Sequence, residues 1–232
     1  MHLKRIPAPK NWMIKRKERK FITRPMPGPH KLNDSITLSI LLKEFLKQAK
    51  TKKEVKYIIN QNKILIDKVS RKDYRFPVGI MDIVEIPALK EKYMVLYNER
   101  GKFMLSPIKD ASQKLLKIIG KTVLRSGRIQ LNFDDGRNII IPKNAYAVGD
   151  TIVFDLENKK IKSHLKLEKD ALIYLTEGSH KGRIGKLQKI EDKEGSENQR
   201  IIFAVGKENL VTLKKYAFVI GKDKPMIEVK YE

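Results

Sequence analysis

The first 31 residues constrain this chain more than any other stretch, because they combine dense positive charge with frequent proline. They hold ten Lys and Arg residues against one acid, Glu18, and five of the ten prolines in the 232-residue sequence. Proline interrupts helices and central strands, and so much like charge opposes a packed core. We therefore expect residues 1–36 to form a basic extension that takes its shape against a polyanion, for which phosphate-rich RNA is the obvious candidate.

Apolar side chains are interspersed among the charged residues of this extension. Trp12, Met13, Ile14, Phe21 and Ile22 are groups that can stack on bases or anchor the segment. Trp12 has two open interpretations: stacking on a nucleobase, or packing against the folded body, which is the commoner fate of a lone tryptophan. For the extension as a whole, the alternative is a solvated, disordered arm.

The composition of the whole chain excludes several classes of protein. The net charge is +23 with 41% hydrophobic residues, so most of the chain is expected to fold despite its basicity. The absence of cysteine excludes disulfides, thiolate zinc sites and thiol catalysis. No apolar run approaches the roughly 20 residues of a membrane span, and no secretory signal opens the sequence. We expect a cytoplasmic protein that binds nucleic acid.

Residue types that carry catalysis or bind metals are scattered. The four histidines, at positions 2, 30, 164 and 180, form no helical metal-binding pair. Asp134 and Asp135 are adjacent, but they occupy an expected hairpin tip, where acids commonly serve the turn. The sequence therefore predicts no enzymatic activity, no cofactor and no metal site.

Residues 36–62 have the apolar periodicity of two helices. Leu38, Leu41, Leu42, Phe45, Leu46 and Ala49 fall on one face of the first. The second opens with Thr51 and Glu54, which form a capping box, and Asn62 is expected to end it. Short strands should follow at Ile64–Ile66 and Met81–Ile86, so that two antiparallel helices pack on a small sheet.

Basic residues cluster on these helices and on the charged loop after them. We expect them to converge on one side and to match the phosphates of an RNA helix, with an ordinary solvated helix surface as the alternative. The predicted contacts are Lys43, Lys47, Lys50, Lys52, Lys53, Lys56, Arg71, Lys72 and Arg75.

The rest of the chain is predicted to be mostly strands. In residues 91–169 one helix, Lys109–Ile119, is expected to intervene, with Gly120 as its C-cap. Residues 134–137, Asp-Asp-Gly-Arg, predict a hairpin turn. The expected strands are Tyr93–Asn98, Lys102–Ser106, Arg128–Phe133, Asn138–Pro142, Thr151–Asp155, Leu172–Leu175, Gly185–Ile190, Arg200–Val205 and Asn209–Leu213. Short strands with frequent glycine turns favour small barrels.

A glycine-spaced run links two of these strands. Gly178, Gly182 and Gly185 permit positive φ and close backbone approach, but they match neither a P-loop nor a dinucleotide fingerprint. Lys181 and Arg183 at the loop tip are predicted to touch RNA or a protein partner. A purely structural turn is the alternative.

Four segments together resemble one family. MHLKRIPAPKNW, RPMPGPH, FPVGIMDIVEI and the glycine-spaced run, in this order, are similar to the e-type small-subunit ribosomal protein number four of archaea and eukaryotes. Residues 37–90 resemble its alpha-L RNA-binding motif, and residues 171–190 resemble a KOW motif. One departure is that Ile66-Asp67-Lys68 stands where the family usually has Val-Asp-Gly, which leaves the turn geometry and the direction of Arg71 and Lys72 open.

The resemblance implies an α+β, multi-domain fold in four parts. A basic extended tail (1–36) would precede the alpha-L module, a helical hairpin on a small sheet (37–90). A mostly-β central domain (91–169) would follow, and then an SH3-like KOW barrel with a short tail (170–232).

The resemblance also implies a function: a structural protein of the small ribosomal subunit that binds ribosomal RNA beside neighbouring subunit proteins. Neither a membrane partner nor a homo-oligomer is implied. The family's tail contacts would fall on Lys4, Arg5, Lys10, Trp12, Lys15, Arg16, Arg19, Lys20 and Arg24. Two alternatives remain at this point: a free RNA chaperone or transcription-coupled factor, and an RNA-modifying enzyme that docks through an alpha-L module.

Overall fold

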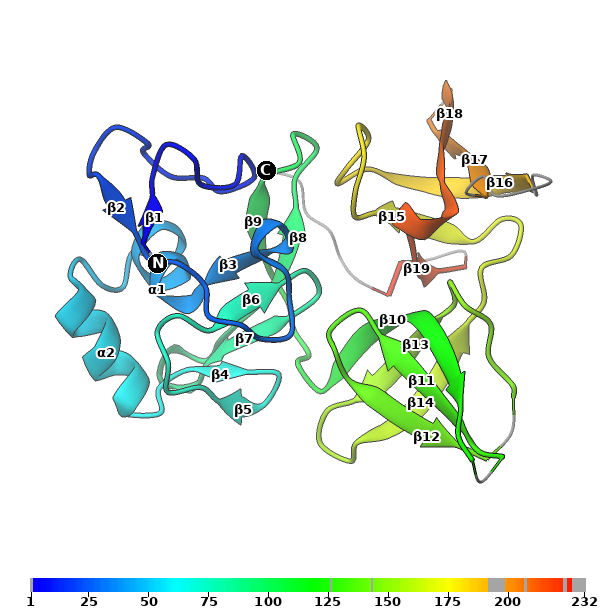
Figure 1. Ribbon diagram of the computed structural model, residues 1–232, viewed down its shortest axis with the longest axis horizontal. Coiled ribbons are helices and arrows are strands. Elements are labelled where there is room, and N and C mark those ends of the chain that lie inside the picture. Colours follow the sequence, from blue (N-terminus) through cyan, green and yellow to red (C-terminus); the bar gives the residue numbers. More distant parts are fainter. Residues whose placement is uncertain are drawn as a thin grey trace. The chain divides into compact units, whose positions relative to one another are not determined.

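The computed structural model describes residues 2–125, 127–142, 144–191, 199–206, 208–222 and 225–226. The chain divides into two compact units, an N-terminal unit of Met1–Tyr97 with Lys102–Lys114 and a C-terminal unit of Asn98–Gly101 with Leu115–Glu232. Most regular structure is strand, with few helices and several sheets (Figure 1). The coarse expectation of a strand-rich protein with several folded parts is confirmed.

The first predicted helix is shorter than expected. It consists of α1 (Leu38–Ile40) and a π-helical turn over Leu41–Phe45, and it buries Leu38, Leu41 and Leu42, while Leu46 is half-buried. Thr37 caps it, because Ile40 N donates to Thr37 Oγ1 at 3.3 Å. The helix does not continue to Ala49, because Leu46 N bonds five residues back to Leu41 O and Lys47 adopts a φ of 53°. A left-handed residue cannot continue a right-handed helix.

The second helix, α2 (Lys52–Asn60), follows its sequence signals closely. Thr51 Oγ1 accepts from Glu54 N at 3.2 Å and donates to Glu54 Oε1 at 2.8 Å, which is the predicted capping box. Asn62 has a φ of 53° and ends the helical turn, as expected. Val55 and Ile59 form its buried face.

An antiparallel five-stranded sheet supports the helices in the N-terminal unit. Its order is β5-β4-β7-β8-β9, formed by Val69–Ser70, Leu65–Ile66, Ile83–Ile86, Glu91–Tyr97 and Phe103–Pro107. A separate antiparallel pair is formed by β3 (Ser35–Thr37), which directly precedes α1, and β6 (Pro77–Gly79). The sheet continues past residue 90, where the alpha-L module is expected to end. Strand β7 pairs with β8 so that Ile83 lies opposite Met94 and Ile86 lies opposite Glu91.

One prediction in the middle of the chain is wrong. The expected helix over Lys109–Ile119 is instead the long strand β10 (Gln113–Val123). Its residues 114–118 are buried on both faces of the sheet. A strand buried on both faces lacks the alternation of apolar and polar residues that indicates a strand, so its sequence is easily taken for a helix. Gly120, expected as a helix cap, lies at a register shift where β10 pairs with β11.

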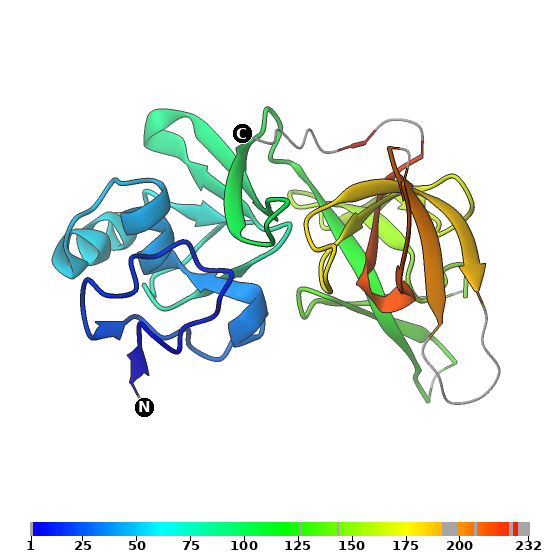
Figure 2. The same cartoon turned by 90° about the horizontal axis from the view of Figure 1, so that it is seen from above.

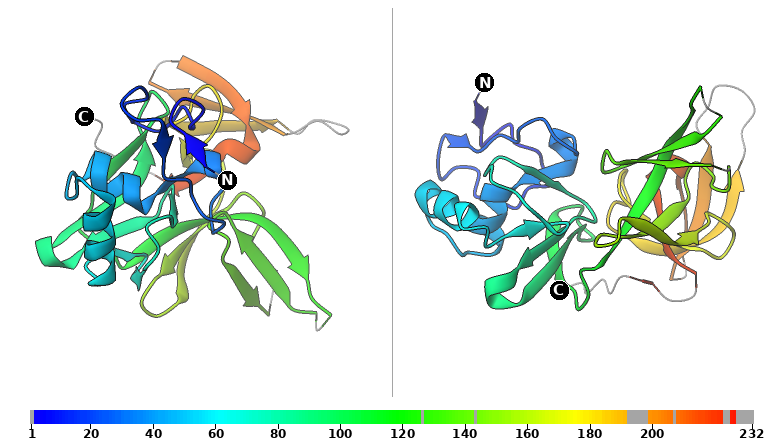
Figure 3. Two further views of the ribbon diagram at one scale, coloured as in Figure 1. Left: turned by 60° about the vertical axis from the view of Figure 1, so that its left-hand side comes forward. Right: turned by 90° about the horizontal axis from the view of Figure 1, so that it is seen from below.

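The C-terminal unit contains two five-stranded antiparallel sheets, which Figure 3 shows in green to yellow and in yellow to orange. The first has the order β12-β11-β10-β13-β14 and adds Asn138–Ile141, Ile129–Phe133, Thr151–Asp155 and Lys160–Leu165 to β10. The hairpin turn at residues 134–137 is confirmed between β11 and β12, with Gly136 at a φ of 77°. The strand β14 is not among the predicted strands, because its sequence KIKSHL is too polar to indicate one.

The second sheet has the order β18-β17-β16-β15-β19. It is formed by Glu208–Leu213, Arg200–Val205, Ile184–Glu191, Leu172–Leu175 and Ala217–Gly221. Four of these strands match the predicted ones, and β19 adds a fifth. Their inward residues, among them Ile173, Leu187, Ile201, Phe203 and Val219, form one apolar core.

Candidate nucleic-acid interface

The basic N-terminal segment is folded, contrary to the expectation that it takes shape only against a polyanion. Strand β1 (Leu3–Lys4) pairs with β2 (Phe21–Ile22), which brings both ends of the intervening loop together. Trp12 is 2% exposed, and its indole Nε1 donates to Ser35 O at 2.8 Å. The packing interpretation of Trp12 therefore describes this structure. Figure 2 shows the segment, in dark blue, folded back against the N-terminal unit.

Arg5 is a structural residue of this folded segment. It is 5% exposed, and its guanidinium donates to Lys15 O at 2.5 Å, to Glu18 at 3.3 Å and to Glu44 Oε1 at 3.0 Å. Glu44 belongs to the π-helical turn, so the Arg5–Glu44 ion pair connects the N-terminal segment to the first helix. The Arg5 guanidinium is therefore engaged in contacts inside the N-terminal unit.

Arg16 has a similar internal role. Its Nη1 donates to the carbonyl oxygens of Arg5, Ile6 and Ala8 at 2.9–3.2 Å, and its Nη2 donates to Pro9 O at 2.9 Å. One side chain thus satisfies the backbone of a turn whose prolines cannot donate hydrogen bonds themselves. The other predicted tail cations, Lys4, Lys10, Lys15, Arg19, Lys20 and Arg24, are exposed.

Cations of α2 and of the loop after β5 meet around Tyr74. The Nζ atoms of Lys52 and Lys56 lie 4.5 and 5.3 Å from the ring centroid, and the guanidinium carbon of Arg75 lies 5.8 Å from it. Arg71 lies over Phe76 at 4.6 Å in the same loop. Cation–π contacts of this kind hold a loop against a helix while leaving the charged groups close to solvent.

Asp73 orients Arg75 within this cluster. The Arg75 backbone N and Nη2 donate to the Asp73 carboxylate at 2.8 and 3.1 Å. Partial burial opposes ionisation of Asp73, but the hydrogen bonds from Arg75 outweigh it and hold the pKa of that carboxyl below its usual value. Asp73 therefore holds the Arg75 guanidinium beside its own loop.

The expected lysine face of the first helix does not form. Lys43, Lys47 and Lys50 share a face only if one helix runs through all three, and this helix ends at Phe45. Lys43 remains in the π-helical turn, while Lys47 and Lys50 lie in the connection to α2. Lys47, Lys50, Lys52, Lys53, Lys56 and Lys72 are all exposed.

A hollow of about 1190 Å³ opens between the N-terminal segment and the helices. We call it the tail hollow. It is lined by residues 2, 3, 5, 19 and 21–32 of the N-terminal segment, and by residues of the first helix, the start of α2 and the loop at Tyr74. Its cationic lining residues are Arg5, Arg19, Arg24, Lys31, Lys43, Lys52 and Arg75.

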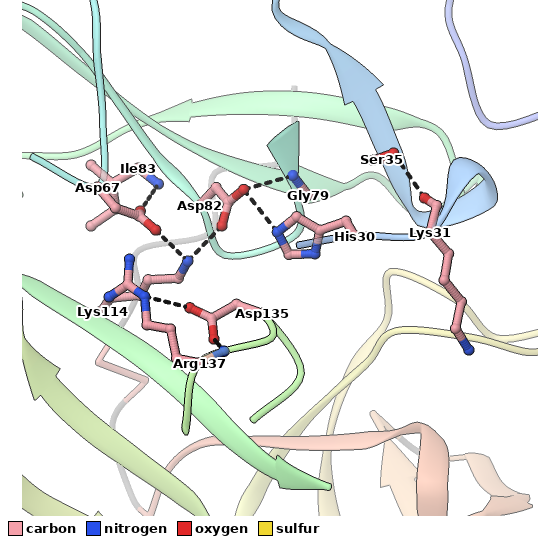
Figure 4. A network of polar contacts seen from close by, with 10 residues as sticks. All are labelled: His30, Lys31, Ser35, Asp67, Gly79, Asp82, Ile83, Lys114, Asp135 and Arg137. Carbon is pink, nitrogen blue, oxygen red and sulfur yellow. Dashed lines mark hydrogen bonds and ion pairs between the residues drawn. The ribbon is translucent and has the colours of Figure 1, made fainter. Parts of the chain in front are cut away.

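A buried polar network anchors the end of the N-terminal segment, and no sequence pattern indicates it. Lys114 Nζ lies 2.6 Å from Asp67 Oδ2 and 2.5 Å from Asp82 Oδ1, and His30 Nε2 lies 2.9 Å from Asp82 Oδ2 (Figure 4). Burial opposes ionisation of Asp82, but His30 and Lys114 outweigh it and lower its pKa. Burial raises the pKa of Asp67, although Lys114 opposes the shift.

The turn that departs from the family pattern closes without glycine. Asp67 and Lys68 connect β4 to β5 with φ values of 50° and 64°. Lys68 Nζ lies 3.2 Å from Glu85 Oε2, and Asp67 Oδ1 accepts from Ile83 N at 3.0 Å. These side-chain contacts compensate for placing two non-glycine residues in the left-handed region.

The glycine-spaced run connects β15 to β16. Gly178 and Gly182 both have a φ of 87°. A Cβ at Gly185 would lie 2.5 Å from Ala204 O on β17, so only glycine fits there. Lys181 and Arg183 are half-buried at this loop. The glycines have a structural role, because they allow the positive φ values and the close approach of β16 to β17.

Within the described parts of the chain, no group of three or more His, Asp or Glu residues is placed to hold a metal ion. The same residues include no helix with the length and apolar character needed to cross a membrane. The two acids of the predicted hairpin have local partners. Asp134 accepts from Lys117 N at 3.0 Å, and Asp135 pairs with Arg137 at 3.0 Å.

Comparison with known proteins identifies the same family over most of the chain. Residues 89–161 match the ribosomal family S4e, and residues 1–33 match the RS4NT (NUC023) domain. The small ribosomal subunit protein eS4 of Methanothermobacter thermautotrophicus is 41% identical over 231 residues, covering 98% of this chain and 95% of that protein. The eS4 of Archaeoglobus fulgidus is 39% identical over 232 residues, covering 99% and 98%. A crystal structure of the 30S ribosomal protein S4e from Thermoplasma acidophilum has a TM-score of 0.72 at 33% identity, covering 82% of this chain and 96% of that one.

Proposed function

Because the chain belongs to the ribosomal family S4e, we propose that it is a structural constituent of the small ribosomal subunit. It binds folded small-subunit ribosomal RNA and has no catalytic turnover. The net charge of +23 suits a polyanionic partner. The relatives carry the name small ribosomal subunit protein eS4 and match this chain over nearly its full length.

The observation that carries the proposal is the cluster of cations around Tyr74. Lys52 and Lys56 come from α2 and Arg75 from the loop, so separate elements present charge on one surface. The exposed Lys53 and Lys72 lie on the same two elements. Because lysines are point charges, this surface should bind phosphates with little reading of base sequence.

Residues 37–90 act as an alpha-L RNA-binding module in this proposal. Two helical segments, α1 with its π-helical turn and α2, precede a small sheet, which is the order that the motif requires. The segment around Gly178, Gly182 and Gly185 acts as a KOW motif in an SH3-like barrel. Its antiparallel five-stranded sheet and its glycine-dependent strand approach support this assignment.

The remaining proposed contacts divide by their role. Lys4, Lys10, Lys15, Arg19, Lys20 and Arg24 face the RNA, while Arg5, Trp12 and Arg16 act indirectly by folding the segment that carries them. Lys181 and Arg183 contact RNA or a neighbouring subunit protein. The protein acts in the cytoplasm, within the ribosome, as a single copy beside other small-subunit proteins.

Sedimentation tests this function directly. We expect the tagged protein in a cell lysate to sediment with small subunits in stoichiometric amount, and to leave them only at high salt, because electrostatic contacts to phosphate weaken as salt rises. A protein that sediments free of subunits would contradict the proposal and would favour the RNA chaperone alternative.

A further inference from the structure

We propose that the tail hollow holds unpaired nucleotides of the ribosomal RNA, whereas exposed lysines of α2 and of the loop after β5 that do not line it, Lys53, Lys56 and Lys72, follow duplex backbone. This inference rests on the proposed function and names the kind of RNA that one part of the surface takes.

The shape of the hollow favours a ligand that protrudes. Its volume of about 1190 Å³ is somewhat larger than a typical small-molecule pocket of roughly 300–1,000 Å³. An RNA duplex presents a convex backbone and a shallow minor groove, so it lies along a surface instead of entering a concavity. Unpaired bases in loops and bulges turn away from the helix and can enter one.

The charge of the hollow suits phosphate groups. Arg24, Lys31 and Lys43 line it and form no ion pair with any residue that the structure describes. Figure 4 shows the Lys31 side chain extending away from the His30–Asp82 contact. Glu44 is the acid among the lining residues, and Arg5 neutralises it at 3.0 Å. The hollow therefore keeps an excess of positive charge that its own acids do not cancel.

An exposed aromatic ring distinguishes a nucleotide from other anions. Phe21 lines the hollow from β2 with 50% of its surface exposed, beside the His2 ring at 5.5 Å and Lys20 Nζ at 5.5 Å. Cations combined with an exposed ring are the usual elements of single-strand binding, because every base has a face that can stack. An acidic peptide would use the cations but would gain little from the ring.

The walls of the hollow are held in place by contacts inside the N-terminal unit. The Arg5–Glu44 ion pair joins the segment to the π-helical turn, and His30 joins Asp82 at 2.9 Å. Gly28 packs so closely on Pro77 that a Cβ would lie 2.7 Å from its Cγ. A site that exists before binding loses less entropy when its ligand arrives.

Two RNA probes and a matched pair of variants test the inference. The probes are a closed hairpin duplex and the same duplex with a bulge of unpaired nucleotides. In the full chain, Phe21→Ala removes the ring in the hollow, while Met13→Ala removes an equally exposed side chain of the same segment that does not line it. We expect Phe21→Ala to weaken binding of the bulged probe by about 5- to 100-fold. Its affinity for the plain duplex should stay unchanged, and Met13→Ala should change neither.

A second pair of variants tests the inference by removing positive charge. Arg24→Gln with Lys43→Gln removes two cations of the hollow, and Lys53→Gln with Lys72→Gln removes two that lie outside it. The first pair should reduce the preference for the bulged probe, whereas the second should weaken both probes equally. Equal thermal unfolding temperatures for all variants will show that folding is intact.

Wild-type protein that binds both probes equally, or a Phe21→Ala variant that weakens them equally, would overturn the inference while leaving ribosomal RNA binding intact. If the hollow variants lose a neighbouring subunit protein but neither RNA probe, the occupant is an acidic peptide and the inference is wrong. If the wild-type protein fails to bind small-subunit ribosomal RNA at all, the proposed function fails as well.

Discussion

The imidazole Nε2 of His30 lies 2.9 Å from Oδ2 of Asp82, which joins two motifs that are 52 residues apart in the chain. His30 ends the RPMPGPH segment, and Asp82 belongs to FPVGIMDIVEI. The same carboxylate oxygen accepts from Gly79 N at 2.7 Å. Two segments that characterise the family therefore meet in one contact, which fixes the N-terminal segment to the alpha-L region.

Replacing Gly79 should loosen this contact. A Cβ at Gly79 would lie 2.3 Å from Nδ1 of His30, so Gly79→Ala must displace the ring. We expect a loss of roughly 1–3 kcal/mol in the free energy of unfolding, together with faster hydrogen exchange in residues 2–31. Gly120→Ala is the control, because its nearest neighbour outside the adjoining residues is 3.7 Å away. Unchanged exchange in Gly79→Ala would show that the ring contact does not hold the segment.

Asp82 should make stability depend on acidic pH. Its pKa is lower in the folded state than in the unfolded chain, because His30 and Lys114 outweigh the effect of burial. Its contribution is therefore complete above the unfolded pKa of about 4 and is lost as pH falls toward the folded value. Asp67, whose pKa burial raises, acts in the opposite sense and reduces the slope.

The variant Asp82→Asn separates this contribution from that of other carboxylates. It leaves Lys114 and His30 without their shared partner, so the free energy of unfolding at pH 7 should fall by about 3–5 kcal/mol. Urea unfolding measured between neutral and acidic pH should also show a shallower loss in the variant than in the wild type. Parallel curves for the two proteins would contradict the assignment.

Lys117 should also make stability rise with pH, but in the alkaline range. Burial lowers its pKa to about 8, although Asp134 and Glu177 oppose the shift, and its Nζ donates to Lys215 O at 2.6 Å. Between pH 8 and the unfolded pKa of about 10.4, the unfolded chain binds the proton more strongly. Stability contributed by this group therefore rises with pH across that window.

Lys117→Met tests whether burying this charge is unfavourable. At pH 7 we expect the variant to be more stable by roughly 1–3 kcal/mol, and the alkaline rise in stability should disappear. Chemical unfolding at pH 7, 9 and 10 measures both effects. A less stable variant at pH 7 would mean that the hydrogen bond to Lys215 outweighs the desolvation of the ammonium group.

The turn at Asp67 and Lys68 offers a comparison of backbone strain with an ion pair. Lys68→Ala removes the ion pair with Glu85 but keeps a non-glycine residue at a φ of 64°, whereas Lys68→Gly removes the ion pair and relieves the strain. Lys68→Gly should therefore be more stable than Lys68→Ala by about 1 kcal/mol in urea unfolding. Equal stabilities would indicate that the turn is not strained.

Features encoded locally can be predicted from the sequence, and features that depend on distant partners cannot. The Thr51–Glu54 capping box and the strand Arg200–Val205 are both correctly predicted, because a helix cap and a short apolar run rich in β-branched residues act over a few positions. The strand β10 resembles a helix in sequence, because burial on both faces removes the period of two. The fold of the N-terminal segment escapes prediction because Arg5 is held by Glu44, 39 residues away.

The candidate interface follows the same division. The lysines of α2 can be chosen from helical spacing alone, and the structure places Lys52 and Lys56 beside Arg75. Tyr74, the residue around which they gather, carries no signal in the sequence, because a single tyrosine in a charged loop has no pattern. The tail hollow depends on how the N-terminal segment folds back, so residue spacing cannot indicate it.

The salt dependence of RNA binding should locate the duplex-binding surface. Replacing Lys53, Lys56 and Lys72 with glutamine removes three exposed cations from α2 and the loop after β5, none of which lines the tail hollow. For every phosphate that the variant no longer neutralises, the slope of log affinity against log salt should fall by about 0.7–0.9, because fewer counterions are released on binding. As a control of equal charge, Lys160, Lys162 and Lys169 are exposed lysines of the C-terminal unit. Filter binding to small-subunit ribosomal RNA over a range of salt concentrations measures both triple variants. An equal decrease of slope in the two would mean that total charge, and not the position of the lysines on α2 and the loop after β5, determines attachment.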